Sequence, residues 1–191
     1  MIEEKRKVKR LKALLVIDYT YDFIAEEGAL TVGAPGQAIE DAIVDKVEAF
    51  HRAGDLVVYA VDVHEQNDQC HPETALFPPH NIRGTKGREL YGKVGTQYER
   101  IKGENHVIWL DKTRYSAFVG TNLDLLLRER GITDVHLVGD VTDICVLHTA
   151  VYAYSLGYKL TIYKEGVASF DASGHEWALR HFQQALGATV V

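Results

Sequence analysis

The chain has 191 residues, with 27 acidic and 21 basic side chains that give a net charge of −6 at pH 7. An acidic chain is poorly suited to neutralising nucleic-acid phosphates, and its longest apolar run, residues 56–61, is far shorter than the ~18 residues of a membrane helix. Two cysteines are too few for a disulfide framework. We therefore expect one cytoplasmic domain over residues 1–191, with neither a nucleic acid nor a membrane as partner.

The chain begins with a basic segment, residues 1–11, which lacks the apolar region and cleavage site of a secretory signal. Short apolar runs rich in β-branched residues follow it and predict strands buried on both faces. They are residues 13–17, 56–61, 107–110, 135–138, 160–163 and 188–191.

Helical patterns separate these runs. Apolar residues at helical spacing predict one face of each helix: Ile39, Ile43, Val47 and Phe50 in the first, Leu123, Leu126 and Leu127 in the next, and Trp177, Phe182 and Leu186 in the last. Asn122 is predicted to cap the second of these, and Thr142 or Asp143 to cap a further helix that runs to Leu156. A glycine ends each helix, at Gly54, Gly131, Gly157 and Gly187. Alternating strands and helices predict a three-layer, doubly wound α/β fold around a mostly parallel sheet of about six strands.

Residues 63–106 interrupt this alternation. No strand is predicted there, and the stretch holds three of the four prolines, Pro72, Pro78 and Pro79. Loops of this length within a compact domain are usually functional. We therefore expect a site in this loop.

Polar side chains follow successive predicted strands. Asp18 comes after the first, Asp62 and His64 after the second, and Lys112 after the third, while Cys145 lies in the first turn of the helix that follows the fourth. Ligands of open parallel sheets bind outside the carboxyl ends of the strands. The sequence therefore predicts that these side chains converge on one site.

Within this set, Cys145 is the candidate nucleophile. A helix N-terminus and a nearby ammonium such as Lys112 both favour the thiolate, and Asp18 could accept the thiol proton. Each residue alone has a plainer interpretation: a buried thiol, a turn-capping aspartate and a surface lysine. Asp22 is the aspartate we expect to be structural.

A second group of nitrogen and oxygen donors, Asp62, His64, His71, Glu73 and His80, suits Zn²⁺, Mn²⁺ or Fe²⁺. The plainer interpretation of any one loop histidine is a solvated side chain or a turn cap. The other histidines have no such context: His51, His106, His136 and His175 receive no role, and His148 and His181 are expected to pack or face solvent on helices. Cys70 is expected to be an incidental loop thiol.

Four segments, ALLVIDYTYDF (13–23), VDVHEQNDQCHPETALFPPHNIRGT (61–85), DKTRYSAF (111–118) and VGDVTDICVLHTA (138–150), resemble the nicotinamidases of the isochorismatase-like cysteine hydrolases. The resemblance covers nearly the whole chain from residue 13. It implies an isochorismatase-like fold with a Rossmann-like strand order. It also implies an enzyme of pyridine-nucleotide salvage that hydrolyses nicotinamide to nicotinate and ammonia through a thioester. We expect a homo-oligomer, and the sequence leaves the acceptance of pyrazinamide open.

The same resemblance assigns roles to residues. Cys145 matches the nucleophile, Asp18 the general base and acid, and Lys112 the third member of a triad. A cis peptide between Asp140 and Val141 would direct the amides of Val141 and Cys145 at the oxyanion.

The resemblance also implies a metal site and a substrate pocket. Asp62, His64 and His80 match metal ligands, and the HPE triplet favours Glu73 over His71 as the remaining one. We expect one divalent ion, Zn²⁺ first, with Fe²⁺, Mn²⁺ or Mg²⁺ as alternatives. Phe23, Phe77 and Tyr115 match positions that line the substrate pocket.

Two other interpretations remain open at this point. One is a metal-free relative that acts on another small amide or ureido compound. The other is a non-catalytic binding or receiver-like α/β domain, which would need neither Cys145 nor the long loop.

Overall fold

In the computed structural model, residues 11–191 are described, so the predicted basic segment at residues 1–11 lies almost wholly outside the described residues. The strands are β1 (Ala13–Ile17), β2 (Leu56–Asp62), β3 (Val107–Lys112), β4 (Asp134–Asp140), β5 (Lys159–Ala168) and β6 (Thr189–Val190). The helices are α1 (Tyr21–Ile24), α2 (Ala34–Ala38), α3 (Glu40–Ala53), α4 (Gly92–Ile101), α5 (Leu123–Glu129), α6 (Leu147–Ser155) and α7 (Ala172–Gln184). Within residues 11–191, no helix combines the length and the apolar character needed to cross a membrane.

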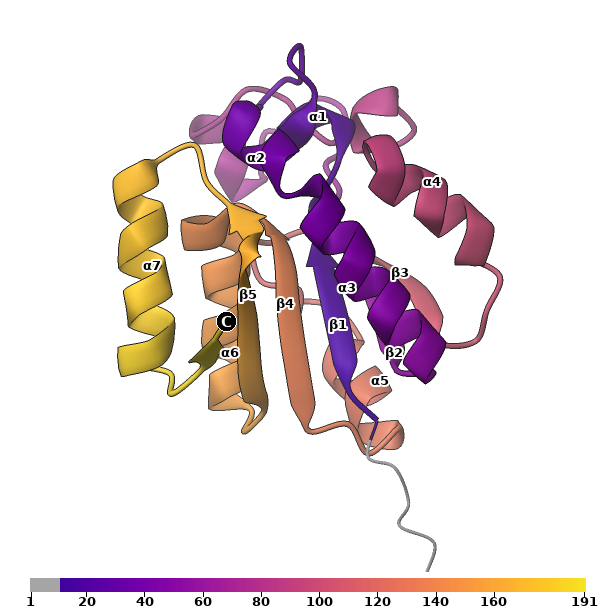
Figure 1. The fold of residues 1–191 in the computed structure, drawn as a ribbon. Helices are drawn as coiled ribbons and strands as arrows, with labels where there is room; N and C mark the ends of the chain where they lie inside the picture. Colours follow the sequence, from indigo (N-terminus) through magenta and orange to yellow (C-terminus); the bar gives the residue numbers. More distant parts are fainter. Residues whose placement is uncertain (1–10) are drawn as a thin grey trace, which may run out of the picture.

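The strands form one sheet in the order β3-β2-β1-β4-β5-β6, and every neighbouring pair is parallel (Figure 1). The predicted α/β class, parallel sheet and Rossmann-like order are therefore confirmed. Strands β2 and β3 are added on one side of β1, and β4, β5 and β6 on the other, so the direction of strand addition changes between β1 and β4. In folds of this kind, the carboxyl ends of the strands flanking that change of direction form the usual ligand-binding crevice.

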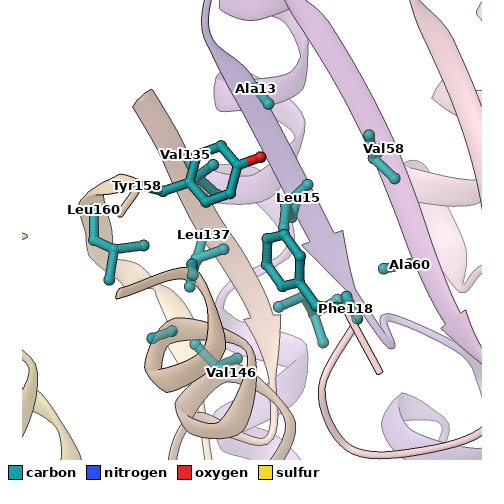
Figure 2. Packing of buried hydrophobic residues seen from close by; sticks show 14 of the residues in the cluster. Ala13, Leu15, Val58, Ala60, Phe118, Val135, Leu137, Val146, Tyr158 and Leu160 are labelled. Carbon is teal, nitrogen blue, oxygen red and sulfur yellow. The ribbon is translucent and has the colours of Figure 1, made fainter. Parts of the chain in front are cut away.

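The sheet separates two apolar layers because alternate side chains of each strand point to opposite faces. Leu15 and Val58 pack with α5, α6 and α7, as Figure 2 shows for the part of this layer around Leu137 and Val146. Leu14 packs on the other face with α1, α3 and α4. Strands covered on both faces read as continuous apolar runs, which is why the sequence predicts them well.

The four glycines predicted to end helices all have positive φ. Gly54 shows the reason: at φ 68° it is the C-cap of α3, and its N–H bonds to the carbonyls of Phe50 and His51. A left-handed residue at this position turns the chain from α3 into β2. These helix ends agree with the prediction.

Two predicted helix caps are wrong. Asn122 occupies the predicted N-cap position of α5, but its side chain makes no capping hydrogen bond; Thr121 Oγ1 instead accepts from the N–H of Leu123. Neither Thr142 nor Asp143 caps α6, because residues 142–146 already form a π-helical turn that leads into it. The wider turn lets the chain leave β4 without a polar N-cap.

Residues 63–106 contain no strand of the sheet, but they are not all loop. Residues 92–101 form α4, which buries Val94, Gln97 and Ile101 at helical spacing against the sheet face shared with α3. Strand β5 is also longer than predicted. It continues to Ala168 through Lys164 and Glu165, whose charges end the apolar run in the sequence.

Candidate active site

Asp18 occupies a strained position at the carboxyl end of β1. Its φ is 56°, in a region that non-glycine residues rarely adopt. The carboxylate is fully buried, and its Oδ1 accepts a hydrogen bond of 2.7 Å from the N–H of Asp62 at the end of β2. Such strain persists where the surroundings hold it, and it is concentrated at functional sites.

Lys112, the last residue of β3, extends its ammonium into the same space. Its Nζ lies 2.7 Å from Asp18 Oδ2, 3.4 Å from Asp62 Oδ1 and 3.6 Å from Cys145 Sγ, and the side chain is 0% exposed. A buried lysine is tolerated only with close anionic partners. Lys112, at the end of β3, therefore contacts the carboxylates at the ends of β1 and β2 as well as the thiol.

Cys145 lies in the π-helical turn after β4 and is 4% exposed. Its thiol contacts the Asp18 carboxylate as well as Lys112. The sequence led us to expect a lowered thiol pKa. In the structure burial raises the pKa of Cys145 well above its ordinary value, although Lys112 opposes that shift. The thiol is therefore neutral at rest and needs a base to ionise it.

Asp18 is the carboxylate placed to act as such a base. Burial raises its pKa to about 6, against the lowering effect of Lys112. A carboxyl with a pKa near neutrality can both accept and return a proton at physiological pH. Asp18, Lys112 and Cys145, predicted from separate strand ends, are thus brought together.

The second predicted group also comes together. Ligand atoms of Asp62, His64, Glu73 and His80 all lie within 4.8 Å of one another, and all four residues are buried. Asp62 Oδ2 is 2.7 Å from His64 Nε2 and 3.6 Å from His80 Nε2, and Glu73 Oε2 is 3.6 Å from His80 Nε2. Two carboxylates and two imidazoles are a set suited to Zn²⁺ and similar ions.

The hydrogen bonds of His80 support this fit. Its Nδ1 donates to the carbonyl of Pro78 at 2.8 Å, so Nε2 is the nitrogen left for a metal ion, and this buried atom has no hydrogen-bond partner among residues 11–191. Histidine ligands of metals usually donate their other nitrogen in this way. Burial lowers the pKa of His80, but Asp62 and Glu73 outweigh it and raise that pKa to about 10. The group thus attracts positive charge, which is what a cation site requires.

His71, the alternative ligand, is placed differently. Its Nδ1 accepts from the N–H of Glu73 at 3.3 Å, and its Nε2 donates to the carbonyl of Thr113 at 2.8 Å. Both ring nitrogens are therefore engaged, and His71 does not belong to the group of four. The geometry favours Glu73, as the sequence led us to expect.

A pocket opens beside the thiol. Its lining includes Phe23, Phe77 and Tyr115, the three residues predicted for it, together with Cys145, Glu73 and His80. Leu30, Ile144 and Phe170 also line it and were not predicted. Phe170 follows the carboxyl end of β5, so a correct end for that strand would have identified it.

The remaining predictions near the site concern the backbone and single side chains. The peptide between Asp140 and Val141 is cis, as the resemblance implies. Asp22 is structural, since its Oδ2 accepts a 2.7 Å hydrogen bond from the N–H of Asn81. Cys70 is exposed and lies outside both groups.

The comparisons agree with this geometry. Residues 12–191 match the isochorismatase domain family. An "uncharacterized isochorismatase family protein PncA" of Bacillus subtilis is 56% identical over 94% of this chain and 98% of its own. A crystal structure described as nicotinamidase/pyrazinamidase PncA from Bacillus subtilis has a TM-score of 0.93 and 57% identity, covering 95% of this chain and 99% of that one. The pyrazinamidase of Pyrococcus horikoshii in complex with zinc has a TM-score of 0.82 at 27% identity, covering 94% and 98%. The chain belongs to the isochorismatase family.

Proposed function

We propose that the protein is a metal-assisted nicotinamidase, which hydrolyses nicotinamide to nicotinate and ammonia through a thioester on Cys145. One observation carries this proposal. The Cys145 thiol, backed by Asp18 and Lys112, opens onto an apolar pocket whose lining also includes Glu73 and His80 of the candidate metal group. The pocket thus combines a nucleophile, flat aromatic surfaces and a place for a cation to hold the substrate.

Catalysis begins with a proton transfer inside the triad. Asp18 accepts the thiol proton, and the thiolate attacks the carboxamide carbon. Lys112 keeps Asp18 in place and offsets the negative charge that forms on sulfur. The tetrahedral oxyanion is held by the amides of Val141 and Cys145, each contributing about 3 kcal/mol at typical values.

The second half of the reaction reuses Asp18. The carboxyl returns its proton to the departing nitrogen, so that ammonia leaves and a thioester remains. Asp18 then removes a proton from water, which attacks the thioester carbonyl and releases nicotinate and the Cys145 thiol. A carboxyl with a pKa of about 6 suits both directions of proton transfer.

Asp62, His64, Glu73 and His80 would hold the divalent ion, Zn²⁺ first and Fe²⁺, Mn²⁺ or Mg²⁺ as alternatives. When bound, it supplies a Lewis-acidic coordination position for the pyridine nitrogen of the substrate. Phe23, Phe77 and Tyr115 line the pocket, where they would pack against the ring and keep water from the thiol. We further propose that pyrazinamide is accepted, because it presents a similar ring and the same amide. We also propose that the enzyme is cytoplasmic, forms a homo-oligomer and acts in NAD salvage.

Product analysis tests the proposal. Purified protein is incubated with nicotinamide before and after chelation, and after Zn²⁺ is restored, while nicotinate and ammonia are measured. We expect hydrolysis that is lost on chelation and recovered with metal. Hydrolysis of a ureido compound, with no dependence on metal, would favour a metal-free amidohydrolase instead.

A further inference from the structure

A second cluster of metal-binding side chains lies away from the candidate active site. His51 near the end of α3, and Glu104 and His106 in the connection between α4 and β3, place ligand atoms within 4.8 Å of one another. The cluster lies where the chain enters β2 and β3, whereas Asp18 and Lys112 lie where β1 and β3 end (Figure 1). The candidate mechanism uses none of these three residues.

The Glu104 carboxylate faces the Nε2 atoms of both imidazoles. His51 Nε2 is 3.0 Å from Glu104 Oε1, and His106 Nε2 is 3.7 Å from Glu104 Oε2. Ligands bound to zinc at about 2.0–2.2 Å in a tetrahedron are roughly 3.3–3.6 Å apart, so these separations bracket the required value. Because the three ligand atoms lie within 4.8 Å of one another, side-chain rotations can close them around one ion.

An ion pair between Glu104 and His51 does not account for the third residue. The Nε2 atom of His106 is buried and, within the described part of the chain, has no hydrogen-bond partner, although it faces the carboxylate. The two imidazoles also stack, with ring centroids 5.1 Å apart and planes 22° apart. Protonating both rings would place like charges in contact, whereas a shared ion satisfies both nitrogens.

The backbone holds the cluster in place without an ion. The carbonyl of His106 accepts from the N–H of Val57 at 2.8 Å, and the carbonyl of Glu104 accepts from the N–H of Val107 at 3.0 Å. The carbonyl of His51 accepts from the N–H of Gly54, the C-cap of α3. With the backbone of all three residues fixed, only their side chains need ordering when the ion binds.

From these contacts we infer that His51, Glu104 and His106 form a second binding site for a divalent transition-metal ion. Two imidazoles and one carboxylate select Zn²⁺, Co²⁺, Ni²⁺ or Cu²⁺ over Mg²⁺ or Ca²⁺, which require oxygen ligands. The ion ties the end of α3 to the start of β3 and leaves coordination positions open to solvent. Its role is structural, and it does not depend on the proposed nicotinamidase activity.

Metal titration tests this inference. Chelated full-length protein is titrated with Co²⁺ or Zn²⁺, and bound metal is measured by equilibrium dialysis and elemental analysis, with the visible spectrum of bound Co²⁺ as a second readout. The wild type is expected to bind one more ion per chain than His106→Gln or Glu104→Gln. His181→Gln, which removes a histidine on α7 outside both groups, should match the wild type.

Thermal unfolding supplies an independent readout. At a metal concentration about 100 times Kd, the second site should raise the Tm of the wild type above that of either variant by roughly 5–10 °C. Nicotinamide hydrolysis by the variants should equal that of the wild type. Equal metal content, Co²⁺ spectra and metal-dependent Tm shifts in the wild type and both variants would overturn the inference.

Discussion

Lys112 Nζ lies 3.6 Å from Cys145 Sγ and 2.7 Å from Asp18 Oδ2, so one ammonium contacts both the candidate nucleophile and its base. The three residues come from the ends of β3, β4 and β1. Their contact depends on the order of the strands, because β1 lies between β2 and β4 in the sheet. Separate substitutions can test the thiol, the ammonium and the packing of the strands.

Replacing Cys145 with alanine removes the nucleophile. We expect ammonia release from nicotinamide to fall by at least about 10³-fold, because the residues that remain cannot form the thioester. A coupled ammonia assay measures the effect, and Cys70→Ala is the matched control, since Cys70 is exposed and outside the site. Substantial turnover by Cys145→Ala would exclude the covalent route.

Replacing Lys112 with methionine leaves Asp18 and Asp62 buried without their cation. Breaking a buried pair in this way costs about 3–5 kcal/mol of the free energy of unfolding. The variant should also alkylate more slowly at Cys145, because the ammonium no longer favours the thiolate. Urea unfolding gives the first quantity and iodoacetamide kinetics the second.

The control for this variant is Lys102→Met. Lys102 is exposed and pairs with Glu99 on the surface, an arrangement typically worth less than about 1 kcal/mol. If Lys112→Met unfolded at the same urea concentration as Lys102→Met, Lys112 would not compensate the buried carboxylates.

Glu73 and His71 can be compared directly as metal ligands in a His106→Gln background, which removes the second proposed site. Glu73→Gln should weaken metal binding by more than the roughly 10–100-fold typical of an outer-shell change, because it removes a charged ligand. His71→Gln should have the smaller effect, since both nitrogens of His71 bond elsewhere. Competition with a chromophoric chelator measures both affinities, and the reverse order would identify His71 as the ligand.

Gly139 of β4 pairs with Ile17 of β1 and leaves no room for a side chain. A Cβ at this position would lie 2.0 Å from the carbonyl oxygen of Ile17, and its φ is +112°. Gly139→Ala should therefore lower the free energy of unfolding by about 2 kcal/mol or more. Gly103→Ala, where a Cβ meets no atom within 4 Å, should change it little. Chemical denaturation of both variants measures the difference.

His136 should make stability depend on pH. Burial lowers its pKa to about 4, whereas the unfolded chain protonates histidine near ~6.5. Between these values the unfolded state binds more protons, so stability falls as the pH drops from about 6.5 to 4. The loss due to His136 should reach about 2 kcal/mol at pH 5.

The measurement for His136 is urea unfolding at pH 7 and pH 5. His136→Phe keeps a ring against Phe50 and removes the titration, so its stability should fall less over this range than that of the wild type. His181→Gln should behave as the wild type. If the free energy of unfolding of His136→Phe fell as much between pH 7 and pH 5 as that of the wild type, His136 would not be held neutral by the fold.

The sheet, and the convergence of Asp18, Lys112 and Cys145, could be predicted from the sequence because their signals are local. Strands such as β1 and β2 are apolar from end to end, and Asp18 and Asp62 stand at their ends. The sequence predicts β5 only as far as residue 163, because Lys164 and Glu165 interrupt its apolar run. The prediction therefore does not reach Phe170, which lines the pocket.

The candidate metal group shows where local reasoning fails. Asp62 and His64 are adjacent to a predicted strand, but Glu73 reaches them only through the path of residues 65–80, which no periodicity encodes. The choice between Glu73 and His71 depended on family resemblance, and hydrogen bonds of His71 explain it. The cluster of His51, Glu104 and His106 cannot be predicted from local patterns, because His51 lies 53 residues before Glu104 in the chain.

Cys145 is proposed to carry the acyl group of nicotinamide during turnover. Wild-type protein mixed with nicotinamide and quenched in acid within the first turnover should yield a peptide containing Cys145 that carries a nicotinoyl group, as measured by mass spectrometry. The adduct should be absent when nicotinamide is omitted. Rapid production of nicotinate with Cys145 unmodified at every quench time, together with full activity of Cys145→Ala, would contradict the account.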